Sequence, residues 1–131
     1  MPTTLAEFAD AKYLNLRSFK KDGQPVDTPV WFALLDERAV VFTDGTSYKV
    51  KRIRRNPRVE IARCDFSGKV LGPWVPGTCR TIEEDKDRLA RAYRALNQKY
   101  GLLMRLGTFF STLAGRVKRR LILEIALEPQ P

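Results

Sequence analysis

The residues best suited to chemistry lie in one basic segment, TDGTSYKVKRIRRNPR, residues 43–58. Six cations fall in the ten positions from Lys49 to Arg58, and no acid lies among them. At the start of the segment, the Ser47 hydroxyl, the Lys49 amine and the free N–H groups of a first helical turn come together. That combination binds anions. The later arginines suit a solvated helix face and a helix C-terminus: Arg54, Arg55 and Arg58.

The sequence offers little for other kinds of chemistry. It has no histidine, which removes the commonest general acid or base and every Ser-His or Cys-His nucleophile. Cys64 and Cys79 form no CxxC motif, so we expect two reduced thiols and no metal site. The one cluster of acids stands where a helix should begin, at Glu83, Glu84, Asp85 and Asp87. We therefore assign no catalytic side chain, and any enzymatic chemistry should come from a bound cofactor.

Length and charge set the class of protein. The 131 residues fit a single domain, residues 1–131, and the net charge of +9 favours an anionic partner. The N-terminus lacks the basic and apolar pattern of a signal peptide. The most apolar late stretch, residues 102–115, contains Arg105 and is too short to span a bilayer. We expect a cytoplasmic protein without a membrane span.

Hydrophobic patterns predict five or six antiparallel strands. Asp22-Gly23 indicates a hairpin turn between the first two, and bends are expected at Gly72-Pro73 and Pro76-Gly77. Such strands, joined in sequence, favour a small barrel, which would leave no exposed edges. The predicted strands cover residues 12–19, 26–35, 39–43, 58–65, 69–83 and 119–127.

The helices are predicted from stripes and caps. Val50 and Ile53 form the inner stripe of a short helix from Tyr48 to Arg55, which Asn56-Pro57 ends. A further short helix over residues 3–10 would have Thr3 or Thr4 as N-cap and turn Leu5, Phe8 and Ala9 inward. A capping box from Thr81 to Glu84 would open a later helix, ended by Gly101 and followed by one over residues 102–114. The inner stripe of the later helix is Leu89, Ala92, Tyr93, Leu96 and Tyr100.

In this order of elements, the chain resembles the pyridoxamine 5′-phosphate oxidase-like split-barrel family. The resemblance covers about residues 8–128, and its most specific parts are GQPVDTPVWF and KVKRIRRNPRV. It implies a mainly β fold with flanking helices, a flavin-reductase-like split barrel, and a homodimer with cofactor sites near the interface. In that family the S-x-K element, here Ser47 to Lys49, holds the phosphate of a flavin.

The resemblance also implies which residues line the cofactor. The second strand of the hairpin would run along the ring system, although core packing explains Trp31 equally well. Pro76 and Gly77 could let backbone approach the cofactor closely. The implied cofactor-binding residues are Val30, Trp31, Phe32, Thr43, Ser47, Tyr48, Lys49, Lys51, Arg52, Arg55, Pro76 and Gly77.

More narrowly, the chain looks like the short actinobacterial branch that uses coenzyme F-420, an 8-hydroxy-5-deazaflavin, in place of FMN. The ending EIALEPQP lacks the longer, arginine-rich C-terminus that binds pyridoxamine phosphate, so that substrate is improbable. The deazaflavin carries a phosphodiester and a polyglutamate tail, which Lys51, Arg52 and Arg55 would suit. FMN, with one terminal phosphate, is the alternative cofactor.

The resulting expectation is an oxidoreductase that moves a hydride between coenzyme F-420 and a small unsaturated organic acceptor. A non-catalytic cofactor carrier and an FMN enzyme of the same fold are the alternatives. A nucleic-acid-binding barrel is more remote, because Tyr48 alone supplies an aromatic ring among the cations and no recognition helix is visible. We expect no nucleic-acid partner.

Overall fold

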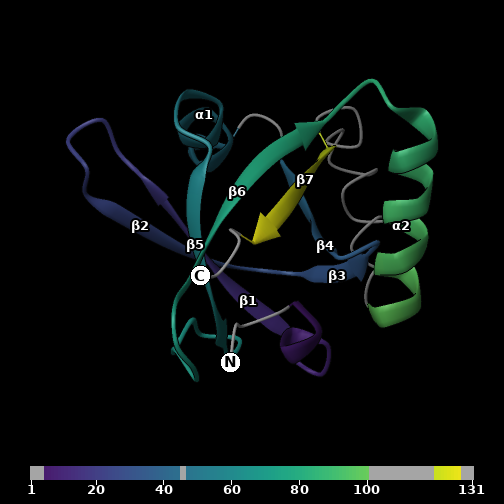
Figure 1. The fold of residues 1–131 in the computed structure, drawn as a ribbon, viewed down its shortest axis with the longest axis horizontal. Helices are drawn as coiled ribbons and strands as arrows, with labels where there is room; N and C mark the ends of the chain where they lie inside the picture. The colour runs from purple at the N-terminus through teal and green to yellow at the C-terminus, as the bar shows by residue number, and fades with distance from the viewer. Residues whose placement is uncertain (1–4, 45–46, 101–119, 128–131) are drawn as a thin grey trace.

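The computed structural model describes residues 5–44, 47–100 and 120–127. One antiparallel sheet contains all the strands that it describes, in the order β2-β1-β5-β6-β7-β4-β3 (Figure 1). The helical elements are η1 (Leu5–Phe8), α1 (Tyr48–Arg55) and α2 (Lys86–Tyr100). The strands are β1 (Tyr13–Phe19), β2 (Pro25–Val30), β3 (Phe32–Leu35), β4 (Arg38–Asp44), β5 (Arg58–Cys64), β6 (Val75–Ile82) and β7 (Arg120–Leu127).

The two outermost strands of this sheet are neighbours in the chain. β2 and β3 lie at opposite ends of the strand order, yet Trp31 alone separates them in sequence. The chain therefore brings the two edges of the sheet together at Trp31, and the sheet curls into a barrel. This confirms the predicted mainly β split barrel with flanking helices.

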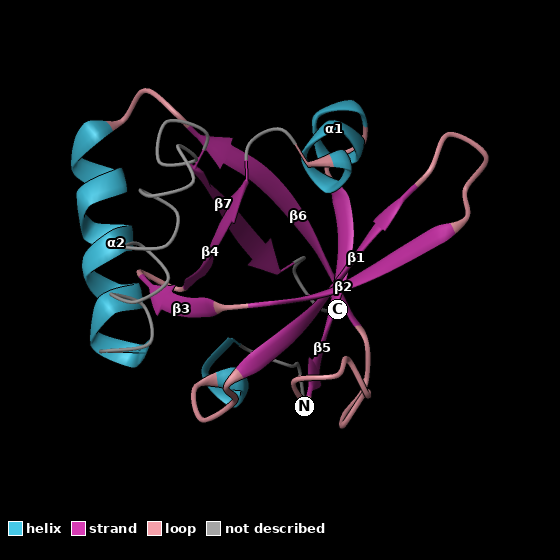
Figure 2. Cartoon of the chain, turned by 180° about the vertical axis from the view of Figure 1, so that it is seen from behind, coloured by secondary structure: helices cyan, strands magenta, loops and turns pink. Residues whose placement is uncertain are grey.

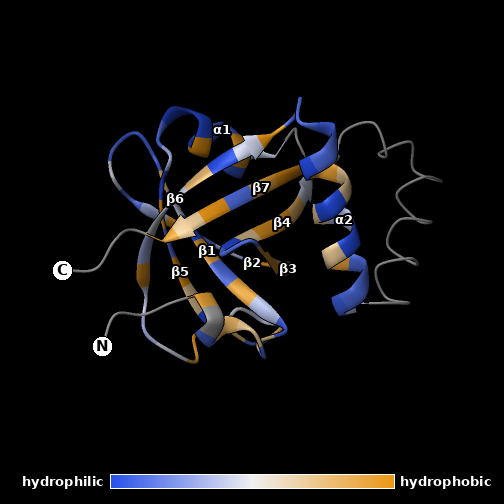
Figure 3. Cartoon of the chain, turned by 45° about the vertical axis from the view of Figure 1, so that its right-hand side comes forward, coloured by the Kyte–Doolittle hydropathy of each residue, from blue (hydrophilic) through white to orange (hydrophobic). Residues whose placement is uncertain are grey.

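Two apolar clusters fill the two faces of the curved sheet. The first lies inside the barrel, where Leu14, Val41, Ile61 and Leu123 meet Val50 of α1. The second lies outside, where Val40, Ile82 and Ile122 meet Ala92 and Leu96 of α2. Figures 2 and 3 show α1 at one end of the barrel and α2 along its side, with apolar and polar stretches alternating along the strands. The period-two alternation of the strands separates the two clusters.

Helix α1 has the predicted bounds. Val50 and Ile53 are fully buried, and their spacing of three places both on the side facing the barrel. Asn56 adopts an extended conformation, with φ −138° and ψ 103°, because Pro57 disfavours helical angles in the residue before it. No described helix has the length and apolar character needed to span a membrane.

Two predictions about strands are wrong. The described chain has seven strands rather than five or six, because the predicted strand over residues 26–35 divides at Trp31 into β2 and β3. The bend predicted at Pro76-Gly77 is absent, since β6 runs from Val75 to Ile82. Pro76 precedes the first pair of the β6–β7 ladder, so its missing N–H removes no bond from that ladder.

The predicted helix starts also need correction. The ladder to β7 extends to Ile82, so Thr81 lies in β6 and the capping box is wrong. Instead, Asp85 Oδ1 accepts a hydrogen bond from the Arg88 N–H at 3.0 Å. The inner stripe of α2 is confirmed. Near the N-terminus, Leu5 and Phe8 are buried as predicted, but Ala9 is exposed. The predicted Thr3 or Thr4 cap, the Gly101 stop and the helix over residues 102–114 lie outside the described residues.

Tyr100, at the end of α2, holds the junction between β2 and β3. Its hydroxyl accepts a hydrogen bond from the Phe32 N–H at 2.9 Å, and it lies 2.6 Å from the Lys12 carbonyl oxygen, to which it donates. Its ring stacks on Trp31, with centroids 4.7 Å apart. Burial raises the pKa of Tyr100 to about 12, so the hydroxyl keeps its proton at neutral pH. One side chain thus satisfies backbone groups where the ladder is interrupted.

We expect Tyr100→Phe to lower the free energy of unfolding by about 1–3 kcal/mol, because it leaves buried backbone groups at the junction without a partner. Urea denaturation followed by far-UV circular dichroism measures this loss. Tyr48→Phe is the matched control, since Tyr48 is 75% exposed, and it should change stability by less than about 0.5 kcal/mol. Equal effects at both positions would contradict the role given to the Tyr100 hydroxyl.

Gly77 generates a second prediction, because a Cβ there would lie 2.7 Å from the Ala126 carbonyl oxygen in β7. Gly77→Ala should therefore force β6 and β7 apart and lower the free energy of unfolding by about 1–3 kcal/mol. Gly72→Ala is the control, since its Cβ would make only ordinary contact, 3.9 Å from the Arg63 side chain. Urea denaturation should show a change below about 0.5 kcal/mol for the control. A Gly77→Ala protein as stable as the control would show that the two strands can separate freely.

Candidate functional site

The end of β4 and the start of α1 meet at a lysine. Lys49 Nζ donates a hydrogen bond to Thr43 Oγ1 at 2.6 Å. Thr43 is buried and faces the same side of β4 as Val41, while Lys49 is half-buried. The structure thus brings together two of the predicted cofactor-binding residues, and it fixes the position of the lysine amine.

Ser47 stands immediately before α1 with a buried, unsatisfied hydroxyl. Its backbone is extended, with φ −68° and ψ 155°, and its side chain does not cap the helix. The Oγ atom is buried and has no hydrogen-bond partner among the described residues. Leaving such a group unpaired costs about 1–3 kcal/mol, so an unsatisfied buried hydroxyl calls for an explanation. A ligand oxygen that binds at the start of α1 would supply the missing partner.

The basic residues of α1 divide into two groups. Arg52 Nε donates to Ser18 Oγ at 2.7 Å, and Arg55 donates to the Phe19 carbonyl oxygen at 3.2 Å, so both arginines tie the helix to β1. Burial and the neighbouring Arg55 lower the pKa of Arg52. Lys51 instead extends toward solvent, as does Tyr48, another predicted site residue. The Lys51 amine lies 5.3 Å from the centre of the Tyr48 ring.

The late arginines predicted to face water are all exposed. Arg54 nevertheless forms an ion pair with Glu83, beyond the end of β6. Arg58 begins β5. The exposed cations therefore differ in their surroundings, and exposure alone does not identify those that could meet a ligand.

The predicted ring-lining residues occupy different places. Val30 and Phe32 are buried in the barrel core, and Phe32 has no exposed surface. Trp31 packs against the outer cluster beneath α2 and stacks on Tyr100. Thr43, by contrast, faces the inner side of the sheet. Trp31 and Thr43 therefore lie on opposite faces of the sheet. A ligand that contacted both Trp31 and the start of α1 would have to extend around the edge of the sheet.

Pro76 and Gly77 are distant from the start of α1. Along β7, Thr43 pairs with Leu121 and Gly77 pairs with Leu127. Leu121 and Leu127 are six positions apart, which corresponds to about 20 Å along β7. The structure therefore does not bring this pair to the residues around Ser47, and the close approach of Ala126 already accounts for the glycine.

Two of the buried polar residues that sequence reasoning missed accept hydrogen bonds from arginines. Ser18, whose hydroxyl accepts the Arg52 bond, shares the inward face of β1 with Leu14 and Leu16. Glu124 interrupts the apolar run of β7 and accepts hydrogen bonds from Arg80 and Arg88 at 2.7 and 2.9 Å. Burial raises the pKa of Glu124, but the hydrogen bonds and the positive charges of Arg88 and Arg80 together bring this pKa below its usual value. In both cases the available signal was a polar residue on an otherwise apolar strand face.

The two cysteines are buried and unpaired. Burial raises the pKa of Cys79 to about 12, so its thiol is protonated at neutral pH and is a poor nucleophile. Burial also raises the pKa of Cys64. Neither thiol lies among the residues around Ser47, and the chemistry of that site is therefore that of hydroxyl, amine and backbone N–H groups.

Several solved structures have the same fold as this chain at low sequence identity. A conserved hypothetical protein from Mycobacterium tuberculosis is 21% identical, with a TM-score of 0.70 over 98% of this chain and 83% of that one. The haem storage protein HutZ from Vibrio cholerae is 14% identical, with a TM-score of 0.70 over 96% and 89% of the two chains. An F-420 reductase is 17% identical, with a TM-score of 0.62 over 98% and 97%.

Among curated proteins, no sequence matches this one. The model of the pyridoxamine 5′-phosphate oxidase family, in contrast, matches residues 1–128. That match includes the strands, the S-x-K element and the short helix described above. The chain therefore belongs to the pyridoxamine 5′-phosphate oxidase family, and its curled sheet is the split barrel of that family.

Proposed function

We propose that this protein is a deazaflavin-dependent oxidoreductase, which transfers a hydride between coenzyme F-420 and a small unsaturated organic acceptor. The observation that carries the proposal is the unsatisfied, buried Ser47 hydroxyl beside Lys49 at the start of α1. Membership of a family that binds flavins supports a cofactor at this place. The matching F-420 reductase, a chain of nearly the same extent, supports the choice of a deazaflavin.

The donor set fits a phosphate group. The Ser47 hydroxyl and the N–H groups of the first turn of α1 are hydrogen-bond donors, and phosphate oxygens are acceptors. Lys49 adds a positive charge, which Thr43 holds at the same end of the helix. These residues would bind and orient the phosphate end of the cofactor.

The remaining positive charge on α1 supports coenzyme F-420 over FMN. Lys51 and Arg55 are exposed on α1, beyond the residues that one phosphate needs. They would meet the carboxylates of a polyglutamate tail, which FMN lacks. Each such exposed pair contributes about 0–1 kcal/mol, so the tail would add a modest preference for coenzyme F-420. Arg52 would contribute its charge while it keeps its hydrogen bond to Ser18.

When bound, the deazaflavin would supply the hydride chemistry. The chain itself would contribute binding, orientation and exclusion of water, and we assign no side chain as a catalytic acid. In the proposal, the segment Val30–Phe32 runs near the ring system, and a second copy of the chain covers the ring in a cytoplasmic homodimer. Haem is less suitable, although HutZ stores it, because this chain has no histidine to serve as an axial ligand.

The proposal predicts tighter binding of polyglutamylated coenzyme F-420 than of FMN, because the cations of α1 exceed what a single phosphate requires. Quenching of tryptophan fluorescence at matched, moderate salt measures both affinities. In addition, reduced coenzyme F-420 should be reoxidised faster as the concentration of a quinone or enone acceptor rises.

The outcomes of these assays separate the alternatives. Equal or tighter binding of FMN would overturn the deazaflavin assignment and leave an FMN enzyme of the same fold. Binding of coenzyme F-420 with a reoxidation rate that no acceptor changes would identify a carrier rather than an enzyme.

A pair of substitutions tests the placement of the phosphate. Lys49→Ala should weaken cofactor binding roughly ten- to a hundredfold, because a hydrogen bond to a charged group contributes about 1.5–3 kcal/mol. Arg58→Ala, at an exposed position at the start of β5, should change the affinity less than about threefold. Fluorescence titration of both variants gives the comparison. Similar losses at the two positions, with a smaller salt slope of single-stranded nucleic-acid binding in each, would favour a nucleic-acid partner.

A further inference from the structure

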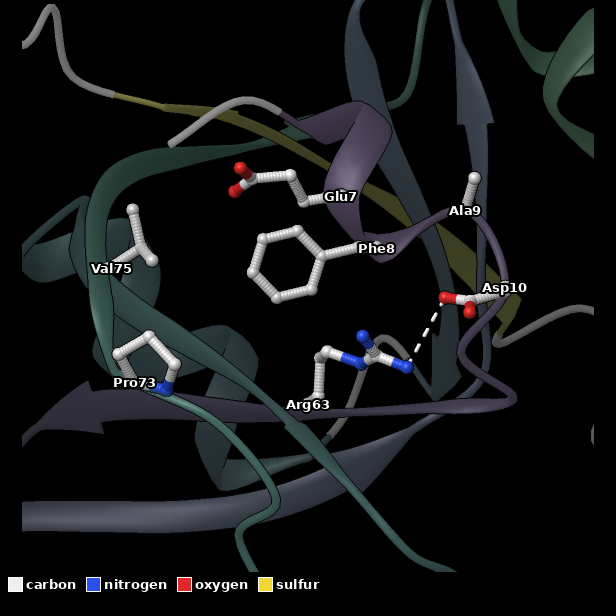
Figure 4. A pocket seen from close by; sticks show the side chains of 7 residues that line it. All are labelled: Glu7, Phe8, Ala9, Asp10, Arg63, Pro73 and Val75. Atoms are coloured by element: carbon white, nitrogen blue, oxygen red, sulfur yellow. Dashed lines mark ion pairs between the residues drawn. The ribbon is translucent and has the colours of Figure 1, made fainter. Parts of the chain in front are cut away.

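A pocket of about 560 Å³ is lined in part by residues of η1 (Figure 4). The purple turn of η1 lies at the end of the barrel away from α1 (Figure 1). β5 begins at Arg58, directly after α1, and Arg63 near its far end reaches the pocket. Those five positions correspond to about 17 Å of strand, so the pocket is separate from the start of α1. Its volume falls within the roughly 300–1,000 Å³ of small-molecule sites.

The walls of the pocket are largely apolar. Phe8 of η1 and Val75 of β6 face it from two sides, and Pro73 from the β5–β6 connection closes a third (Figure 4). Phe8 is 3% exposed and Val75 4% exposed, so each is fixed by core packing and presents only a small part of its side chain to the pocket. A pocket with fixed apolar walls can bury the hydrocarbon part of a ligand.

The pocket contains one ion pair and one further carboxylate. Arg63 Nη2 lies 3.2 Å from Asp10 Oδ1, and these two charges compensate each other. Glu7 also lines the pocket, and its carboxylate stands beside the Phe8 ring on the side of Val75 (Figure 4). Among the described residues, none forms a hydrogen bond or ion pair with Glu7. The pocket is therefore locally acidic in a chain whose net charge is +9.

We propose that this pocket binds a small amphipathic cation, that is, a primary ammonium attached to an aromatic or aliphatic body. The body would be buried against Phe8, Pro73 and Val75, where each buried CH₂ contributes about 0.8 kcal/mol. The ammonium would pair with Glu7.

An anionic ligand fits the same pocket less well. Arg63 already has a carboxylate partner, so a ligand carboxylate would have to displace Asp10. It would also bring a third negative charge next to Glu7 and Asp10. The proposal concerns a site of opposite charge preference to that at the start of α1, and it does not depend on the proposed function.

Titration of the whole chain with 4-phenylbutylamine, followed by ¹H–¹⁵N chemical shifts, tests the proposal. Saturable shifts are expected at residues 7–10, 63 and 75. The amine should bind at least about threefold more tightly than 4-phenylbutanol, and 4-phenylbutyrate should bind most weakly of the three. Glu7→Gln should weaken binding of the amine about three- to tenfold and leave binding of the alcohol unchanged.

Glu84→Gln is the matched control, because it removes the same charge at an exposed position between β6 and α2. It should change the affinity for the amine less than about 1.5-fold, in line with the weakness of distant screened charges. The proposal is overturned if the carboxylate binds as tightly as the amine, or if Glu7→Gln and Glu84→Gln have equal effects. Shifts confined to residues 65–71, beside the neighbouring pocket, or the absence of saturable shifts, would also overturn it.

Discussion

The fold depends on the closure of one sheet through a single residue. Because β2 and β3 occupy its two edges and Trp31 alone joins them, the edges cannot separate without breaking the ladders on both sides. Closure joins the two edge strands through the chain, although each of them pairs with a neighbouring strand on one side only. It also interrupts the ladder at Trp31, and Tyr100 supplies hydrogen bonds there from a helix that begins far away in sequence. The position of α2 is thus coupled to the closure.

A closed barrel has two ends, and this chain covers them differently. Helix α1 lies at one end and inserts Val50 and Ile53 into the core, while its outer surface is basic. Near the other end, η1 contributes Leu5 and Phe8 to the same core and presents Glu7 outward. The inner side chains of both elements are fixed by packing, so the backbone positions from which their outer side chains extend are fixed as well. The outer surface is therefore basic at α1, whereas η1 presents a carboxylate at the other end.

The sequence predicts local features well and pairing-dependent features poorly. The bounds of α1 follow from a three-residue apolar spacing and the Asn56-Pro57 dipeptide, which act within the helix itself. The division at Trp31 depends on β2 pairing with β1 and β3 pairing with β4, and no local signal contains that information. In the same way, pairing of Ile82 with Ile122 overrides a capping box that is locally reasonable.

The candidate site shows the same contrast between local and distant determinants. Ser47 and Lys49 could be singled out because they are neighbours in the chain, and the structure places the lysine amine against Thr43 from the preceding strand. Ser18 could not be linked to Arg52 from the sequence, since 34 positions separate them. Its signal, a hydroxyl on an inward strand face, indicated an internal partner without identifying it. A motif therefore indicates the centre of a candidate site, whereas the contacts that support the motif depend on the tertiary fold.

Arg52 gives an argument for an anion at α1 that is independent of Ser47. Its guanidinium is partly buried and bonds to the neutral Ser18 hydroxyl, and among the described residues no carboxylate pairs with it. Burial and the like charge of Arg55 lower its pKa, which means that both disfavour the charged form. Arginine nevertheless remains protonated, so Arg52 and Arg55 place two positive charges close together on α1. In the proposed function, a negatively charged group bound along α1 would be attracted by both of these charges.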